Sequence, residues 1–405
     1  MKTRYGLSPW IEGFPDTRRP AFEPFRGEKT ADIVIVGGGL TGCATALALA
    51  SAGRRPIVLE AGRVGQGSAG RSTGLLLAEP GPSFRDLVQL HGLRSTRIIF
   101  EAWKAAALDA AALVRRAGIR CNATPVDRVL AAVRDDPRSL RRELESRTEA
   151  GFDATWLDGK RMQQMLRLQA DGAMRSRGGL AVDPYALCLG LARAAIKKRA
   201  RIFEKSPVEK ITFGAKDAEI VLRGAAIRCE TVIVTTGTAT KLFKPLQRHL
   251  KSRERYAVLT EPVPAVIRKQ LAADDIFLRL ARTPPFQFRW APDHRLLVSG
   301  ADQDQTAPAR REPLLVQRTG QLMYELLTTY PMISGLRPEF GWDVPYGETA
   351  DGLMFAGPHR NYPRHLFALG GNGESIAGAF LAARLLTRAA QGAAEKSDAV
   401  FGWTR

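Results

Sequence analysis

Residues 32–42 read Asp-Ile-Val-Ile-Val-Gly-Gly-Gly-Leu-Thr-Gly, a β-branched run that opens directly into three spaced glycines. In a strand–turn–helix of this kind, Gly37 permits the tight turn, Gly39 lets the backbone approach a pyrophosphate, and Gly42 lets the helix pack closely on the strand. Glu60 ends a second apolar run, at the spacing of about 20 residues where a carboxylate accepts hydrogen bonds from ribose hydroxyls. Strand, glycines, helix and acid in register predict a dinucleotide-binding α/β unit, and an ordinary glycine-rich turn is the alternative.

The chain is long and strongly basic. Its 405 residues suffice for two domains with sizeable cores. It has 60 Lys and Arg residues against 41 Asp and Glu residues, which gives a formal charge of +19. The basic residues are spread along the chain, and no aromatic-interleaved binding motif accompanies them. We therefore expect a solvated basic surface, not a nucleic-acid partner.

The four cysteines, at positions 43, 121, 188 and 229, show no Cys-x-x-Cys spacing. This pattern predicts reduced thiols, with neither a disulfide framework nor a metal site. No run approaches the roughly 18 apolar residues that a membrane span needs. Arg18-Arg19 is followed by Pro20 and Glu23 where a twin-arginine signal has an apolar stretch. We expect a soluble, unexported, cytoplasmic protein.

Several further motifs occur together between Asp32 and Ala390. They are Gly-Ser-Ala-Gly-Arg-Ser-Thr-Gly at 67–74, Val182-Asp-Pro184, Val208, Thr236-Gly237, Thr260-Glu-Pro262, Thr349-Ala-Asp-Gly352, Ala356-Gly-Pro358 and Gly370–Gly373. With the fingerprint, they make the sequence resemble the D-amino acid oxidase-like superfamily of FAD-dependent oxidoreductases, which holds glycine oxidase, sarcosine oxidases and γ-glutamylputrescine oxidase. The resemblance implies an α/β fold, with a Rossmann-type FAD-binding domain and an interleaved antiparallel-sheet substrate domain.

The resemblance also divides the chain. It implies an N-terminal arm at 1–27, FAD-binding segments at 28–85, 181–245 and 346–395, and substrate-domain segments at 86–180 and 246–345. The FAD-binding residues that it implies are Gly37, Gly39, Leu40, Thr41, Gly42, Glu60, Arg71, Ser72, Thr73, Val208, Thr236, Gly237, Gly371, Asn372 and Gly373. The last three have a physical warrant, because amide groups at a helix N-terminus stabilise the negative charge that develops at the flavin N1–C2=O edge on reduction.

The resemblance implies a reaction as well. Hydride equivalents pass from the carbon next to an amine nitrogen to flavin N5, in an amine or amino-acid-like small molecule. A neutral amine needs no strong general base for this step, so we nominate no catalytic residue. Relatives that tether the flavin do so through a cysteine, and no cysteine follows Cys229. We expect noncovalent FAD.

The sequence departs from the family near the substrate. Glycine oxidase-like members clamp the substrate carboxylate with an Arg where this chain has Tyr346, whereas Arg337 is an alternative, shifted clamp. Sarcosine oxidase-like members carry a Lys just after the last glycine turn, where this chain has Glu374-Ser375. Glu374 either faces the flavin, where it suits a cationic substrate, or stabilises the start of its helix. These departures favour an amine that lacks the usual carboxylate.

Residues 286–290 alternate, with Phe286, Phe288 and Trp290 on one face of the expected strand and Gln287 and Arg289 on the other. Such an aromatic stripe is more often core than pocket. Even so, Trp290 joins Tyr346 and Glu374 as a candidate for substrate contact.

The electron acceptor is open. Sarcosine oxidases use a Lys above the flavin to promote the reaction with oxygen, and this chain has no lysine between Lys269 and Lys396. Another cation, such as Arg289 or Arg295, replaces it, or electrons pass to an acceptor other than oxygen. Two other functions stay open at this point: a flavin enzyme acting on an RNA-attached amine, and a non-catalytic FAD-binding subunit of a complex.

Overall fold

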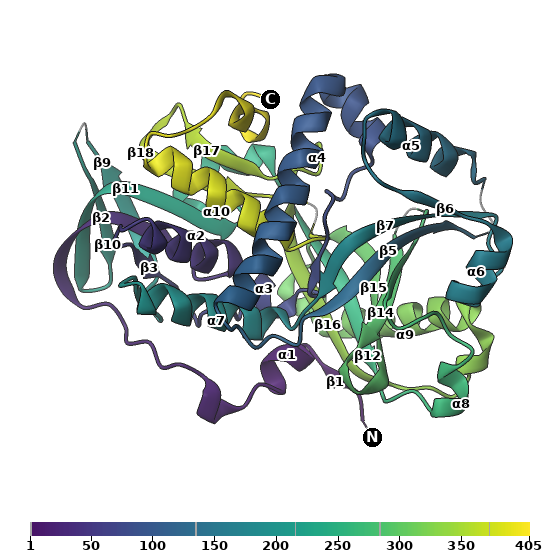
Figure 1. Cartoon of the computed structure of the whole chain (residues 1–405). Helices are drawn as coiled ribbons and strands as arrows, with labels where there is room; N and C mark the ends of the chain where they lie inside the picture. Colours follow the sequence, from purple (N-terminus) through teal and green to yellow (C-terminus); the bar gives the residue numbers. More distant parts are fainter. Residues whose placement is uncertain (1, 134–135, 215, 283–284, 372) are drawn as a thin grey trace.

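The computed structural model describes residues 2–133, 136–214, 216–282, 285–371 and 373–405, which form two bodies around two β-sheets (Figure 1). One sheet carries the glycine fingerprint and is called here the fingerprint sheet. The other, called the covering sheet, lies beside it. Helix α4 (Phe84–Arg116) runs along the junction between them (Figure 1).

The fingerprint sheet has the strand order β17-β18-β11-β2-β3-β8, and β10 and β9 extend from β11. Pairing is parallel from β18 through β11, β2 and β3 to β8. Because β2 is central and covered on both faces, its apolar run is continuous, and residues 33–36 are all buried. The strands are β2 (Gly27–Val36), β3 (Ile57–Leu59), β8 (Arg201–Phe203), β9 (Val208–Phe213), β10 (Ala218–Leu222), β11 (Ala225–Gly237), β17 (Phe355–His359) and β18 (Tyr362–Leu369).

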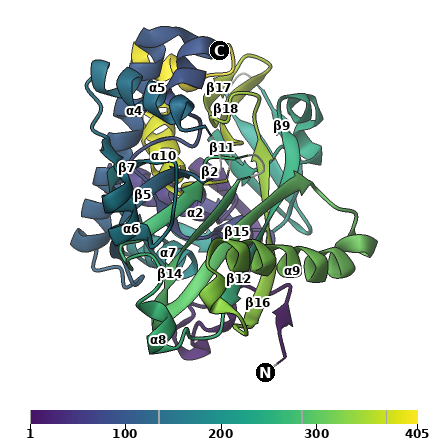
Figure 2. The ribbon, with the colours of Figure 1, turned by 90° about the vertical axis from the view of Figure 1, so that its right-hand side faces the viewer.

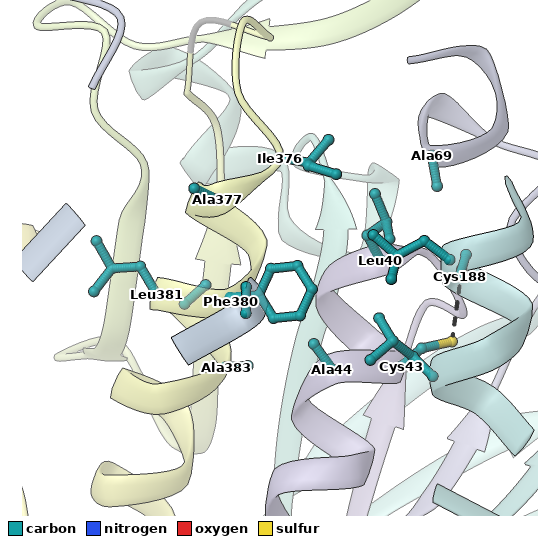
Figure 3. Close-up of a cluster of buried hydrophobic side chains, with 14 of the residues drawn as sticks. Leu40, Cys43, Ala44, Ala69, Cys188, Ile376, Ala377, Phe380, Leu381 and Ala383 are labelled. Carbon is teal, nitrogen blue, oxygen red and sulfur yellow. Dashed lines mark hydrogen bonds between the residues drawn. The ribbon is translucent and has the colours of Figure 1, made fainter. Parts of the chain in front are cut away.

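Helices cover one face of this sheet. The fingerprint helix α2 (Leu40–Ser51) packs against both α7 (Pro184–Lys197) and α10 (Ala377–Ala390). Leu40 and Ala44 of α2 lie toward Phe380 of α10, and Cys43 lies toward Cys188 of α7 (Figure 3). The two sulfur atoms are 3.8 Å apart, and all four cysteines are free and buried.

The covering sheet has the strand order β1-β16-β12-β15-β14-β13-β5-β7-β4, and β6 also pairs with β7. Its strands pair antiparallel except for β1 with β16 and β13 with β5, which are parallel. The expected antiparallel sheet is therefore correct apart from these two pairs. Its strands are β1 (Arg4–Tyr5), β4 (Leu75–Leu76), β5 (Thr124–Ala132), β6 (Thr155–Leu157), β7 (Gly172–Ala181), β12 (Lys251–Thr260), β13 (Ile276–Leu280), β14 (Phe286–Ala291), β15 (Arg295–Asp304) and β16 (Pro338–Glu348).

The two faces of the covering sheet have different partners. The outer face carries Phe286 and Phe288 into a core under α9 (Arg311–Thr329), which lies across the sheet (Figure 2). Trp290 packs against the edge of the same core. The inner face instead contributes Leu259 and Trp342 to the core shared with the fingerprint helices. The aromatic stripe at 286–290 is core, as such stripes usually are.

Local signals explain some of the helix boundaries. Asp183 is the N-cap of α7 and accepts hydrogen bonds from the amides of Tyr185 and Ala186, as its position before Pro184 predicts. Helix α4 begins at Phe84 because Ser83 caps it at Asp86 N, and Gly92 (φ 77°) kinks the helix without ending it. The remaining helices are α1 (Pro9–Glu12), α3 (Ser68–Arg71), α5 (Arg138–Glu149), α6 (Gly159–Leu166) and α8 (Ala265–Arg268).

The chain crosses between the two bodies several times. The N-terminal arm adds β1 to the edge of the covering sheet and lays α1 against α3 and α7. Strand β4, which directly follows the second glycine-rich stretch, pairs with β7 of the covering sheet. Among the described residues, no helix is both long and apolar enough to cross a membrane.

Candidate active site

A cleft of about 400 Å³ opens at the carboxyl ends of the parallel strands β2, β3 and β11. This is where open α/β sheets bind ligands, and the volume suits a small-molecule or cofactor site. Twelve residues predicted from the sequence are among those that line it: Gly37, Gly39, Leu40, Thr41, Glu60, Ser72, Val208, Thr236, Gly237, Tyr346, Gly371 and Gly373.

The fingerprint glycines have the geometry that their spacing predicts. Gly37 has φ +110°, a conformation that side chains disfavour, and completes the turn from β2 into α2. A Cβ on Gly42 would lie 1.9 Å from the carbonyl oxygen of Gly37, so only glycine lets α2 pack this closely. A Cβ on Gly39 would meet no atom within 4 Å, because this backbone borders open space in the cleft.

Glu60 lies beside this turn at the end of β3. Its carboxylate accepts hydrogen bonds from the amides of Gly38 (2.7 Å) and Gly62 (2.8 Å), so its position on the cleft wall is held by backbone. The amide of Ser206 donates to the carbonyl of Glu60 (2.9 Å), which brings Ser206 and Val208 to the same end of the cleft.

The segment at 67–74 forms another part of the wall, where Ser72 lines the cleft. Arg71 turns away and pairs with Asp343 of β16 (3.1 Å). Thr73 is buried beneath the wall, and its Oγ1 has no hydrogen-bond partner among the described residues. Neither Arg71 nor Thr73 lines the cleft in the described structure.

Tyr346 and the last glycine turn form the far end of the cleft. Gly373 has φ +66°, and a Cβ there would lie 3.0 Å from the Tyr346 ring. The Tyr346 hydroxyl donates to Asp302 (2.8 Å), and Arg255 holds the same carboxylate with bonds of 2.7 to 3.1 Å. Asn372, predicted to belong to this turn, lies outside the described residues.

Glu374 points away from the cleft. Its carboxylate is 3% exposed and accepts hydrogen bonds from Arg279 (2.6 and 2.7 Å) and Arg128 (3.5 Å) of the covering sheet. Its place at the flavin and its role at the helix start, the two alternatives expected for it, stay predictions. The neighbouring Ser375 lines the cleft and accepts hydrogen bonds from Leu77 N (3.0 Å) and Ala377 N (3.2 Å).

Two other candidates lie elsewhere. The indole of Trp290 donates to the carbonyl of Ala272 (2.9 Å) on the outer face of the covering sheet, away from the cleft. Arg337 is exposed in the loop before β16, where its backbone pairs with Glu261. The described residues contain no group of three or more His, Cys, Asp or Glu side chains that could hold a metal ion.

Sequence reasoning missed part of the wall. Ser206, Thr235, Val344, Pro345 and Gly347 are near neighbours of predicted residues at strand ends, so strand pairing could have found them. Trp103 gives no such signal, because it lies in the middle of α4 and reaches the cleft only through the packing of α4 on α10.

Comparison with known proteins identifies the family. The family model described as FAD dependent oxidoreductase matches residues 32–389. The chain belongs to this family. It is 25% identical over 392 residues to the probable oxidoreductase OrdL of Haemophilus influenzae, with 93% of this chain and 86% of the relative covered. It is 24% identical to the gamma-glutamylputrescine oxidoreductase of Escherichia coli, with 93% and 88% covered.

Solved structures support the fold. The glycine oxidase of Geobacillus kaustophilus superposes with a TM-score of 0.77 at 20% identity, covering 93% of this chain and 99% of that one. The cofactor of this FAD-dependent oxidoreductase is FAD, and the cleft fits it, because the fingerprint backbone leaves open space at Gly39 beside the N-terminus of α2. No cysteine is among the described lining residues, which agrees with noncovalent FAD.

Buried ion pairs dominate the inner face of the oxidoreductase's covering sheet. Arg128 bonds Glu79 (2.9 Å) and Glu374, and Arg147 bonds Glu79 and Glu143. Burial alone would raise the pKa of Glu79, but the positive charges of Arg147 and Arg128 outweigh it and lower the pKa to about 2.

The same balance holds at the other acids of this face. Burial opposes ionisation of Glu374, yet Arg279, Arg128 and Arg255 bring its pKa below the usual value. Asp302 has a lowered pKa because Arg255 outweighs its burial. Arg128, Arg255 and Arg279 on the inner face of the oxidoreductase's covering sheet are thus already paired with carboxylates of the chain.

Proposed function

We propose that this FAD-dependent oxidoreductase oxidises a C–N bond of an amine or amino-acid-like small molecule. The main support is that Tyr346 of the covering sheet and the glycine turn at Gly371 and Gly373 line one cleft with the fingerprint glycines. Relatives support the reaction class, since their names include gamma-glutamylputrescine oxidoreductase and glycine oxidase. No observation favours an RNA-attached substrate or a non-catalytic role.

The chain's own residues bind and orient FAD in this proposal. Gly37, Gly39 and Gly42, with Leu40 and Thr41 at the start of α2, bind the diphosphate, and Glu60 binds the adenosine ribose. Val208 lies by the adenine, and Thr236 and Gly237 continue the wall. Ser72, with Arg71 and Thr73 behind it, supports the flavin, and the turn 371–373 donates amides to its N1–C2=O edge. Bound FAD supplies the hydride acceptor, flavin N5.

We infer that the substrate is not held by a carboxylate clamp. Tyr346 takes the place of the family's arginine, and its hydroxyl is bound to Asp302. Arg279 and Arg255 are each bound to an acid of the chain, so a substrate carboxylate would have to displace Glu374 or Asp302. An amine without a carboxylate binds without displacing either acid.

We also propose that oxygen is a poor electron acceptor, because the span from Lys269 to Lys396 holds no lysine and includes the whole of β13–β16. Arg289 does not replace it, since its guanidinium is bound to the carbonyls of Thr73 and Trp290. We expect stopped-flow reoxidation of the reduced flavin to be slower in air-saturated buffer than with a quinone or dye. Equally fast reoxidation by oxygen would refute this.

Four free thiols fit a reducing compartment, and we propose the cytoplasm. The partner is a small-molecule substrate, and the spread of basic residues gives no reason to add nucleic acid.

An anaerobic screen tests the function. The purified protein should be yellow, and acid precipitation should release its flavin as FAD. Mixing with primary amines, secondary amines and amino acids without oxygen should bleach the flavin with at least one of them. A yellow protein that no amine or amino acid bleaches would contradict C–N oxidation. A flavin that stays in the pellet would contradict noncovalent binding.

A further inference from the structure

Four consecutive carbonyl groups follow one another in the cleft wall at residues 70–73. Each accepts a hydrogen bond from a side chain outside the segment: Gly70 from Ser8 Oγ, Arg71 from Trp342 Nε1 (2.8 Å), Ser72 from Trp10 Nε1 (3.0 Å), and Thr73 from Arg289 Nε and Nη2 (3.1 and 2.6 Å). Regular secondary structure would pair such carbonyls with backbone amides. Here, side chains from the N-terminal arm and from strands β14 and β16 bind them instead.

Two of the four donors belong to the N-terminal arm. Ser8 is 1% exposed and Trp10 is 7% exposed, so both side chains are buried against the body of the protein. Ile11 closes the contact, because a Cβ on Gly70 would come within 3.0 Å of its side chain. The arm is therefore in van der Waals contact with the segment at residues 70–73.

The other two donors come from the inner face of the covering sheet. Arg289 is 3% exposed, and its guanidinium donates to the carbonyls of Thr73 and Trp290, with no carboxylate bound to it among the described residues. Burying a guanidinium in this way is costly. Burial lowers the pKa of Arg289 to about 10, so it still carries a positive charge at neutral pH behind the cleft wall.

The segment separates the arm from the cleft. Gly67, Ser68, Ala69 and Ser72 line the cleft, whereas no described residue of the arm does so. The carbonyls of Gly70 and Ser72 accept hydrogen bonds from the arm, so the arm holds the backbone that carries Ser72 into the cleft wall.

We propose that Ser8 and Trp10 of the N-terminal arm are positioning residues of the FAD site: they hold the backbone of residues 70–73 so that Ser72 keeps its place in the cleft wall. The arm then sets how tightly FAD is retained, without touching it. This role does not depend on which substrate is oxidised.

The test removes one donor and keeps its packing. Trp10→Phe retains an aromatic ring under the segment but loses the indole N–H. Trp290→Phe is the matched control, since it also loses an indole N–H bonded to a backbone carbonyl, at 2.9 Å, but on the outer face of the covering sheet. FAD is stripped from each protein and titrated back, with flavin fluorescence giving Kd and thermal unfolding of the apoprotein giving Tm.

We expect Trp10→Phe to raise the Kd for FAD about three- to tenfold, the worth of one hydrogen bond, and Trp290→Phe to leave it unchanged. Ser8→Ala should also raise the Kd for FAD, and this variant tests the proposal if Trp10→Phe fails to fold. An unchanged Kd in both arm variants, with a lowered apoprotein Tm, would make the arm merely structural and overturn the proposal. FAD binding is measured without substrate, so this outcome is separate from any failure of C–N oxidation.

Discussion

The floor of the cleft and the inner face of the covering sheet are built in opposite ways. The floor consists of backbone from one short stretch, Gly37–Gly42, and its shape depends on side chains that are missing. The inner face instead carries arginines whose partners come from distant parts of the chain: Arg128 binds Glu79 and Glu374, and Arg279 binds Glu374. A missing Cβ acts locally and can be recognised from spacing. An ion pair between distant strands has no local pattern.

A single added Cβ atom should disrupt the floor of the cleft. Gly42→Ala would place a Cβ 1.9 Å from the Gly37 carbonyl oxygen, so we expect α2 to be displaced and folded protein to be lost. Gly39→Ala is the matched control, because its Cβ enters open space and its φ of −80° suits alanine. Gly39→Ala should keep the apoprotein Tm and raise the Kd for FAD at least about tenfold. Apoprotein Tm and FAD titration distinguish the two, and similar behaviour of both variants would contradict this comparison.

Removing one charge of the inner face should destabilise the folded protein. Glu79→Gln leaves the buried Arg128 and Arg147 without a shared carboxylate, and removing one partner of a buried pair costs about 3–5 kcal/mol. Denaturant unfolding should show this loss, while Glu230→Gln at an exposed position should change stability by less than about 0.5 kcal/mol. Equal stability of the two variants would mean that the buried network contributes little.

The same variant has a pH signature. The pKa of Glu79 is lowered to about 2 in the folded state, so its contribution is fully present above its unfolded value near 4.5 and is lost as pH falls toward 2. The stability difference between wild type and Glu79→Gln should therefore narrow between pH 5 and pH 3. A difference that stays constant or widens with acid would contradict the lowered pKa.

Substrate preference tests whether the inner face is closed to anions. An Arg–carboxylate contact in a dry pocket is worth roughly 1.5–3 kcal/mol, so its absence should weaken glycine or sarcosine about ten- to a hundredfold relative to amines. Anaerobic bleaching titrations give these constants. Glu374→Gln should lower stability but leave the Kd of an amine nearly unchanged, because the carboxylate is turned to Arg279. A preference for small α-amino acids that is lost in Arg279→Gln would instead make that arginine the clamp.

The smallest effect is expected where the two regions meet. Tyr346→Phe removes the hydroxyl that donates to Asp302 (2.8 Å), but Arg255 still holds this carboxylate. We expect a loss of about 0.5–1.5 kcal/mol in stability and no change in the Kd for FAD, since the ring remains against Gly373. A large rise in that Kd would show that the hydroxyl, not the ring, shapes the end of the cleft.

By itself the sequence determined the nucleotide-binding half. The apolar run before Gly37, the glycine spacing and Glu60 act within about 30 residues, so local sterics and strand burial suffice to predict β2, α2 and the cleft floor. The cap at Asp183 was predictable for the same reason, because its bonds reach only residues 185 and 186. The continuous family resemblance added the outline of the second half.

Only the tertiary structure decided the rest. It turned Glu374 toward Arg128 and Arg279, placed Trp290 on the outer face, and brought Trp103 to the cleft and Ser8 and Trp10 under residues 70–72. Ser8, Trp10 and Glu374 have partners 62 or more residues away in the sequence, and Trp103 reaches the cleft through helix packing. The hydrogen bond of Trp290 to Ala272 depends on strand register. Sequence periodicity predicts the face of a strand or helix on which a side chain lies. The free energy of a buried charge, in contrast, depends on which opposite charge the fold places beside it.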